Sequence, residues 1–162
     1  MKFSRSTLST AVTVVAGLVL LAALPSAVVD TFETGRIYLF SHQFLDDLPQ
    51  RLTGPGRLRF ILQPAVAIFL GIRGGRIDAQ AGRPPFLYAL LTGSGERNAL
   101  LRSALAAVRD LVSMSIVFDV IAQLLIYGRV YPGAAVVLGP VLICLPYAMA
   151  RALTLRAMRL LR

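Results

Sequence analysis

Three polar residues share one face of a segment that is otherwise apolar. Ser115, Asp119 and Gln123 recur every four residues within 111–127, a spacing that places them on one side of an α-helix. A carboxylate at the centre of a membrane span costs about 2.5–3.5 kcal/mol on an insertion scale, so this stripe should face protein or water rather than lipid. The chemistry that fits is either a proton or ion relay or a hydrogen-bond cluster that holds helices together.

We favour the hydrogen-bond cluster, with a protonated Asp119 and with Gln63 as its partner from another segment. Pairing of Asp119 with a charged residue of another protein is a third alternative. If the stripe is a structural cluster, Asp119→Asn should be tolerated, because an amide still donates and accepts hydrogen bonds at nearly the same volume.

No other residues in the sequence form a pattern typical of catalysis. His42 has Asp46 four residues later, which is more typical of a solvated helix face than of a metal site, and Cys144 lies in an apolar segment where packing explains it. We find no nucleophile elbow, no zinc-protease motif and no phosphate-binding glycine pattern. We therefore expect no enzyme activity, no cofactor and no metal.

Residues 151–162 form a basic amphipathic tail. At about 100° per residue, its arginines fall within an arc of roughly 140°, opposite most of its leucines. Leu155 lies inside this arc and breaks the pattern. Such a helix fits an anionic lipid surface, with ~1 kcal/mol for each basic residue, and a positively charged anchor without a specific ligand is the simpler alternative. No aromatic residue is interleaved to stack on bases, so we expect no nucleic acid partner. The predicted lipid contacts are Arg151, Arg156, Arg159 and Arg162.

The composition indicates the environment in which these residues must be positioned. Of the 162 residues, 56% are hydrophobic and 15% are charged, whereas soluble domains have about 25% charged residues. This excludes a disordered chain and disfavours an ordinary soluble domain. One cysteine and one histidine exclude a disulfide framework and make a zinc site implausible. We predict a single membrane domain over residues 1–162.

Four segments are candidate membrane spans. Residues 8–29 make 22 residues of helix, which rise ~33 Å and can cross a bilayer core. Residues 111–127 and 133–150 are joined by a tight turn, and Pro132 suits the first turn of the returning helix. Residues 57–74 span only if the arginines at their ends reach outward. We therefore predict an all-α membrane protein, a bundle of three to four transmembrane helices whose last two form a tight hairpin, with short amphipathic interfacial helices.

The distribution of basic residues predicts the orientation. Four spans with the N-terminus inside place twelve basic residues inside and five outside; three spans with the N-terminus outside place fourteen inside and three outside. We favour four spans, and both arrangements leave residues 151–162 in the cytoplasm. The first segment also has the form of a secretory signal, but its cleavage site after Ser26 or Ala27 is poor, which favours an anchor.

The remaining segments connect these spans. Residues 31–48 have apolar residues at helical spacing and predict an amphipathic interfacial helix, and residues 49–56 predict a linker. Residues 86–91 are too short to span and should lie in the interface. Residues 98–109 should run into the third span as one long helix.

Small residues at four-residue spacing indicate where helices pack closely. One stripe comprises Ser9, Thr13 and Gly17 in the first span, and another comprises Ala135 and Gly139 in the last. These faces could pack within the chain or against a partner.

One long stretch resembles a known pattern. It begins with RLRFILQP at 57–64, continues through GIRG at 71–74 and GRPP at 82–85, and extends to Asp119 and Gln123. Over roughly residues 57–151, but not in the first span, it resembles a family of small bacterial inner-membrane proteins of unknown function. The resemblance implies a multi-pass protein of the bacterial inner membrane and implies no activity, cofactor or catalytic residue.

We expect a non-enzymatic protein that packs against, assembles or tethers a partner in this membrane, either another membrane protein or a second copy of the chain. The alternative is a small transporter or ion-conducting subunit built around Asp119.

Overall fold

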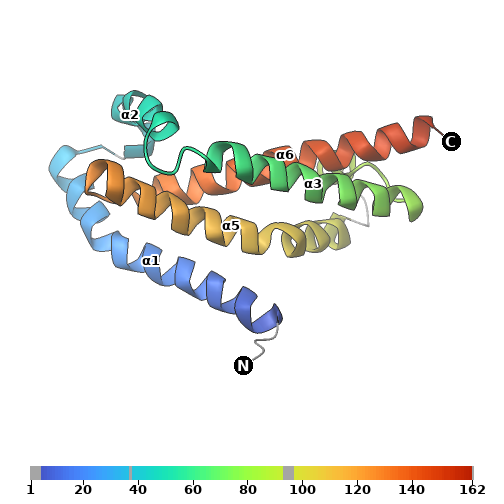
Figure 1. Cartoon of the computed structure of the whole chain (residues 1–162), viewed down its shortest axis with the longest axis horizontal. Coiled ribbons are helices and arrows are strands. Elements are labelled where there is room, and N and C mark those ends of the chain that lie inside the picture. The colour runs from blue at the N-terminus through green and yellow to red at the C-terminus, as the bar shows by residue number, and fades with distance from the viewer. Residues whose placement is uncertain (1–4, 37, 93–96, 162) are drawn as a thin grey trace. The chain divides into compact units, whose positions relative to one another are not determined.

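The computed structural model describes residues 5–36, 38–92 and 97–161, and every regular element within these ranges is a helix (Figure 1). Four helices are long and apolar enough to cross a membrane: α1 (Arg5–Thr34), α3 (Arg59–Gln80), α5 (Arg97–Tyr127) and α6 (Pro132–Leu160). The prediction of an all-helical protein of the membrane class is confirmed at this level.

Three short helices lie between the long ones: η1 (Tyr38–Phe40), α2 (His42–Thr53) and α4 (Phe86–Thr92). The prediction of one helix over 31–48 followed by a linker over 49–56 is wrong. Gly35, at a left-handed φ of 63°, follows the end of α1, and a new helix begins after Ser41 and continues through Pro49. Arg51 lies in the last turn of α2, and its contact with Asp119 stabilises this turn although Pro49 precedes it.

The hairpin between α5 and α6 follows the prediction. Helix α5 is continuous from Arg97 to Tyr127, and Pro132 is the first residue of α6. Gly128 adopts a left-handed φ of 64°, and its N–H donates to the Leu124 carbonyl at 3.0 Å. A residue without a Cβ reaches this conformation at little cost, which explains the sharp end of α5.

The chain divides into two compact units, which are described separately. The first contains residues 1–60 and 112–140; the second contains residues 61–111 and 141–162. The prediction of a single membrane domain stays a prediction.

Small residues bring helices together in the first unit. The Ser113 hydroxyl of α5 donates to Thr13 Oγ1 of α1 at 3.4 Å, and a Cβ at Gly139 of α6 would lie 3.0 Å from Ser115 Oγ. By contrast, a Cβ at Gly17 would meet nothing within 4 Å. The predicted stripes therefore mark packing faces at Thr13 and Gly139 but not at Gly17.

In the second unit, α3 approaches the backbone of α6. A Cβ at Gly71 would lie 2.5 Å from the Tyr147 carbonyl oxygen, and a Cβ at Gly75 would lie 2.5 Å from the Arg151 carbonyl oxygen. Ala67 and Ala79 extend this stripe of small residues by one turn each way and are buried. This face was not predicted from the sequence, although it has the four-residue spacing of close helix pairs in membranes.

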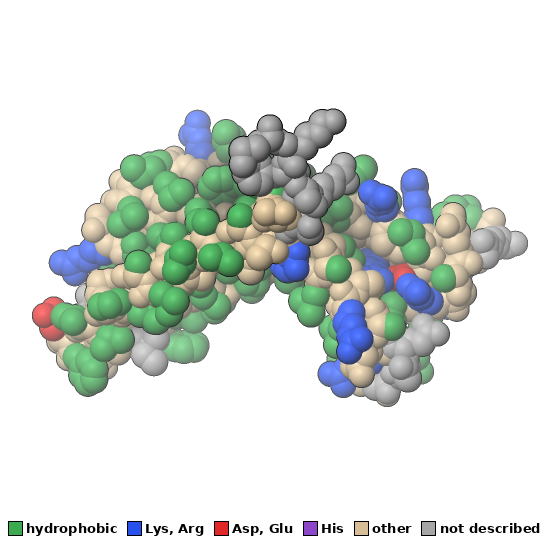
Figure 2. Space-filling model, turned by 90° about the horizontal axis from the view of Figure 1, so that it is seen from below, with side chains coloured by type: hydrophobic (Ala, Val, Ile, Leu, Met, Phe, Trp, Pro, Cys, Tyr) green, Lys and Arg blue, Asp and Glu red, His purple; other side chains and the backbone are tan. Residues whose placement is uncertain are grey.

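The outer surface is largely apolar. Figure 2 shows hydrophobic side chains over much of one face, interrupted by arginine side chains. On α1, Leu8, Leu18 and Leu21 are each about 60% exposed. Large apolar side chains in such numbers suit contact with lipid or with another membrane protein.

Candidate functional sites, two buried arginine–aspartate clusters

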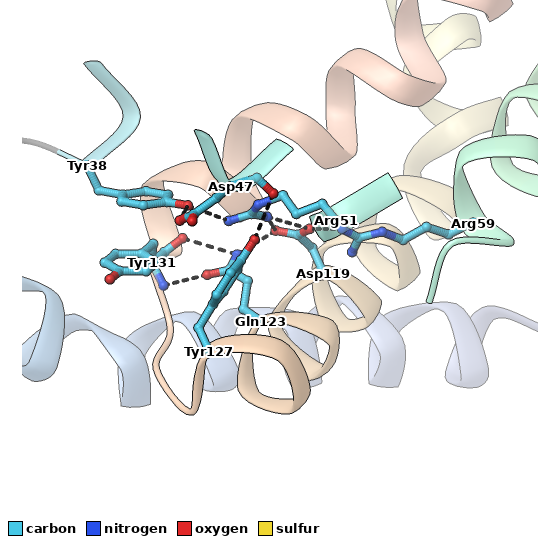
Figure 3. A network of polar contacts seen from close by, with 8 residues as sticks. All are labelled: Tyr38, Asp47, Arg51, Arg59, Asp119, Gln123, Tyr127 and Tyr131. Carbon is cyan, nitrogen blue, oxygen red and sulfur yellow. Dashed lines mark hydrogen bonds and ion pairs between the residues drawn. The ribbon is translucent and has the colours of Figure 1, made fainter. Parts of the chain in front are cut away.

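The first cluster centres on the Asp119 carboxylate, which is 2% exposed (Figure 3). Arg51 of α2 approaches Asp119 Oδ1 with its Nη1 at 3.2 Å, and Arg59, the first residue of α3, forms a second ion pair with the same oxygen. Gln123 Nε2 donates to Asp119 Oδ2 at 2.6 Å. Residues of the first unit from α2, from the start of α3 and from α5 thus meet at one carboxylate.

Aromatic rings surround the Arg51 guanidinium. Its central carbon lies 5.4 Å from the ring centre of Tyr127 and 5.9 Å from those of Tyr38 and Phe44. The negative faces of such rings attract a cation that has lost water. Burial by itself lowers the pKa of Arg51, but the hydrogen bond to Tyr38 and the charge of Asp119 outweigh burial and raise that pKa above its usual value.

Tyr38 links the arginine to a second carboxylate. Its hydroxyl donates to Asp47 Oδ2 at 2.6 Å and accepts from Arg51 Nη2 at 3.3 Å. Burial, followed by the hydrogen bond to Asp47, raises the pKa of Tyr38 well above its usual value of 10.0. Tyr127 also fixes α2, because its hydroxyl donates to the Asp47 backbone carbonyl at 3.0 Å.

Gln123 ties the cluster to the hairpin turn. The Tyr131 N–H donates to Gln123 Oε1 at 2.6 Å, and Gln123 Nε2 lies 3.4 Å from the Tyr131 carbonyl oxygen. The Tyr131 ring stacks on that of Tyr38, with centroids 3.6 Å apart and planes 7° apart. One amide and one ring pair therefore hold the turn against the segment before α2.

The two arginines share a single buried carboxylate. The Arg59 guanidinium lies 4.8 Å from the Phe60 ring centre, and its Nε and Nη1 have no hydrogen-bond partner among the described residues. Asp119 is thus the anion between two cations, an arrangement typical of a structural ion-pair cluster.

The structure gives the position of each residue of the predicted polar stripe. It brings Asp119 and Gln123 together and buries Ser115 against Gly139. Gln63 is buried in the second unit, and its predicted contact with Asp119 stays a prediction. Neither arginine was predicted from the sequence as a partner of Asp119. One signal was available, because Arg51 continues the helical spacing of Phe44 and Leu48 by one turn.

The second cluster lies in the second unit and centres on Asp78, which is fully buried. Arg151 of α6 donates to Asp78 through Nε at 2.6 Å and through Nη2 at 3.0 Å. Its remaining donors reach the Tyr147 hydroxyl at 2.9 Å and Ser103 Oγ at 3.1 Å. Arg83 adds a longer contact to Asp78 at 3.4 Å.

The structure gives Arg151 a protein partner that the tail prediction did not include. This side chain is 3% exposed and bound to Asp78, and its predicted contact with anionic lipid stays a prediction. Leu155, which breaks the predicted pattern, is 1% exposed one turn later, because Arg151 and Leu155 share the buried face of α6. Arg156 and Arg159 are exposed, and Arg162 lies outside the described residues.

The other reactive residues stand apart from these clusters. His42 is exposed at the start of α2. Cys144 is exposed on α6, and the interpretation of its thiol as a packing group stays a prediction. Within the ranges that the structure describes, no group of three or more His, Cys, Asp or Glu side chains could hold a metal ion.

The fold and the two clusters define a class of small helical protein: its long helices are apolar enough to cross a membrane, and they bury arginine–aspartate pairs. Comparisons with protein-family models, with curated proteins and with solved structures found no match. The resemblance of residues 57–151 to bacterial inner-membrane proteins stays a hypothesis.

Proposed function

We propose that this chain is a non-enzymatic component of the bacterial inner membrane that assembles with a partner membrane protein through α1. The observation that carries the proposal is a groove of about 750 Å³ in the first unit. Val19, Ala22 and Val29 of α1 form one wall, and Val120 and Leu124 of α5 form the opposite wall. Shallow apolar grooves between helices accept the side chains of another helix.

The packing of α1 supports this assignment. Only 11% of its most apolar window is buried, compared with 33% for α5 and for α6. Small residues on one wall, such as Ala22 and Ala23, would let a second helix approach closely. Glu33 and Arg129 are the charged residues that line the groove. A partner would need complementary charges where it meets these two side chains.

The alternative is a small transporter or ion-conducting subunit built around Asp119. A carboxylate that carries a proton or an ion must exchange its partners in every cycle. Asp119 instead interacts with Arg51, Arg59 and Gln123, which come from three helices. These contacts favour a structural role for the carboxylate over a relay.

A pair of substitutions on α1 tests the assembly. Ala22→Trp should fill the groove and dissociate the complex extracted from native membranes in a mild detergent, as measured by native gel electrophoresis. Leu21→Trp is the matched control, because Leu21 is 61% exposed and lies outside the groove. A wild-type chain that runs as a free monomer, or equal behaviour of the two variants, would refute the proposal. The chain purified alone distinguishes a second copy from a different partner.

A flux measurement tests the alternative. Proteoliposomes that contain the purified chain should hold an imposed pH gradient as long as empty vesicles do. A leak that disappears in Asp119→Asn while the melting temperature stays unchanged would place the transporter first.

A further inference from the structure

A cavity of about 270 Å³ lies in the second unit beside the buried Asp78–Arg151 pair. Arg73, Arg83 and Arg151 line it together with Asp78. Three guanidinium groups and one carboxylate give this lining a net charge of +2. Since Asp78 is fully buried and Arg151 is 3% exposed, the floor of the cavity is fixed by a rigid ion pair.

The other two arginines that line the cavity, Arg73 and Arg83, differ in whether they form an ion pair. Arg83 makes one long contact with Asp78 at 3.4 Å, and its side chain is 37% exposed. Arg73 is exposed and forms no ion pair with any residue that the structure describes. These two side chains can therefore turn toward an anion without breaking the Arg151 pair.

The wall beside these cations is apolar. Leu70 lies one turn before Arg73 and Ile77 one turn after it, on the same face of α3, and Ile77 is 51% exposed. All three belong to a helix long and apolar enough to cross a membrane. The cavity is slightly smaller than the ~300 Å³ at which pockets begin to enclose a drug-sized ligand, so it suits a polar headgroup while an attached chain lies outside.

We propose that this cavity binds the phosphate headgroup of an anionic glycerophospholipid, with Arg73 and Arg83 contacting the phosphate and one acyl chain lying along Leu70 and Ile77. Basic pockets between membrane helices suit such headgroups. The inference stands independently of the groove on α1. It also differs from the predicted tail contacts, because it needs neither Arg156 nor Arg162.

Native mass spectrometry of the full chain in detergent tests this site. The chain is titrated with dioleoyl phosphatidylglycerol, with dioleoyl phosphatidylcholine and with water-soluble glycerol phosphate. The anionic lipid should bind best, because only it combines a net negative headgroup with an acyl chain.

Arg73→Gln should weaken binding of the anionic lipid about fivefold, which corresponds to ~1 kcal/mol for one basic residue at an anionic surface. Arg76→Gln is the matched control, because Arg76 is also exposed on α3 but does not line the cavity. It should change binding by less than about twofold. Equal loss in both variants would indicate general surface charge and overturn the site. Equal binding of glycerol phosphate would indicate a soluble anion and would overturn the lipid assignment.

Discussion

At the scale of single residues, Asp119 has more partners than its own helix can supply. Arg51 and Arg59 come from other helices, and each is at most 7% exposed. The removal of one partner from a buried ion pair leaves an uncompensated charge, which costs about 3–5 kcal/mol. The sequence-based expectation that Asp119→Asn is tolerated therefore changes.

We now expect Asp119→Asn to destabilise the protein by about 3–5 kcal/mol, since the amide would leave two buried guanidinium groups without a counter-charge. The measurement is thermal or denaturant unfolding of the purified chain in detergent. Asp110→Asn on the same helix is the matched control, because Asp110 is 55% exposed, and it should change stability by less than about 0.5 kcal/mol. If the two variants unfold alike, Asp119 does not hold the first unit together.

The raised pKa of Tyr38 predicts that the folded protein loses stability in alkaline solution. Burial and the hydrogen bond to Asp47 raise its pKa above 10.0, so the folded state holds this proton more tightly than the unfolded state does. The resulting stability is present below pH 10 and is lost as the pH rises, with a slope of at most about 1.4 kcal/mol per pH unit. Unfolding of the wild type above pH 10 should show this slope.

Tyr38→Phe should reduce that alkaline slope, because one titrating hydroxyl is gone. At neutral pH the variant should lose about 1 kcal/mol with its hydrogen bonds. Tyr88→Phe is the control, since Tyr88 is 58% exposed on α4, and it should keep the wild-type slope. An unchanged slope in Tyr38→Phe would exclude Tyr38 as its origin.

The sequence predicts part of the first cluster for a clear reason. A carboxylate and an amide in a long apolar run must be satisfied by protein, which identifies Asp119 and Gln123. Their partners could not be deduced in this way. Arg51 and Arg59 lie in a segment with turn residues such as Gly54 and Pro55, and the folded chain, rather than local spacing, brings them to α5.

At the scale of the elements, the close packing of α3 against α6 depends on two glycines of α3. Gly71→Ala and Gly75→Ala would place a methyl group 2.5 Å from a backbone carbonyl oxygen of α6 in each case. Backbone cannot move aside as a side-chain end can, so the helices must separate. We expect each variant to lose about 1–3 kcal/mol, the usual cost of overpacking, in unfolding experiments in detergent.

Gly17→Ala provides the comparison for these variants. Its Cβ would meet nothing within 4 Å on α1, so alanine should be neutral or should stabilise the helix by up to about 1 kcal/mol. A similar loss in all three variants would mean that glycine matters for reasons other than the α3–α6 contact.

The ends of helices were easier to predict from the sequence than the contacts between helices. Gly128 and Pro132 set the hairpin by backbone conformation, which depends only on local residues, and the prediction there is confirmed. Pro49 and the following glycine-rich stretch predicted a linker, yet α2 continues to Thr53. Contacts of Arg51 with Asp119 and with three aromatic rings override that local signal.

At the scale of the whole molecule, the length of α3 bears on the number of spans. The sequence offers only thirteen uncharged residues between Arg59 and Arg73, which is short for a span. The helix nevertheless runs for 22 residues, from Arg59 to Gln80, and so rises ~33 Å. Asp78 near its end is neutralised by Arg151, which lowers the cost of placing this charge at the membrane. These features support the arrangement with four spans.

Fusions to topology reporters test that arrangement. With four spans, both ends of the chain lie in the cytoplasm, and the turn that contains Arg129 lies outside. A reporter active only in the cytoplasm should therefore work after Arg162 and before Met1, and a reporter active only in the periplasm should work at Arg129. With three spans, the C-terminal fusions behave in the same way. The N-terminus then lies in the periplasm, so only the reporter that is active in the periplasm should work before Met1. The N-terminal fusion thus decides between the two arrangements, because basic residues favour a cytoplasmic location for residues 151–162 in both. A periplasmic C-terminus would refute both and would move the Asp78–Arg151 cluster to the opposite leaflet.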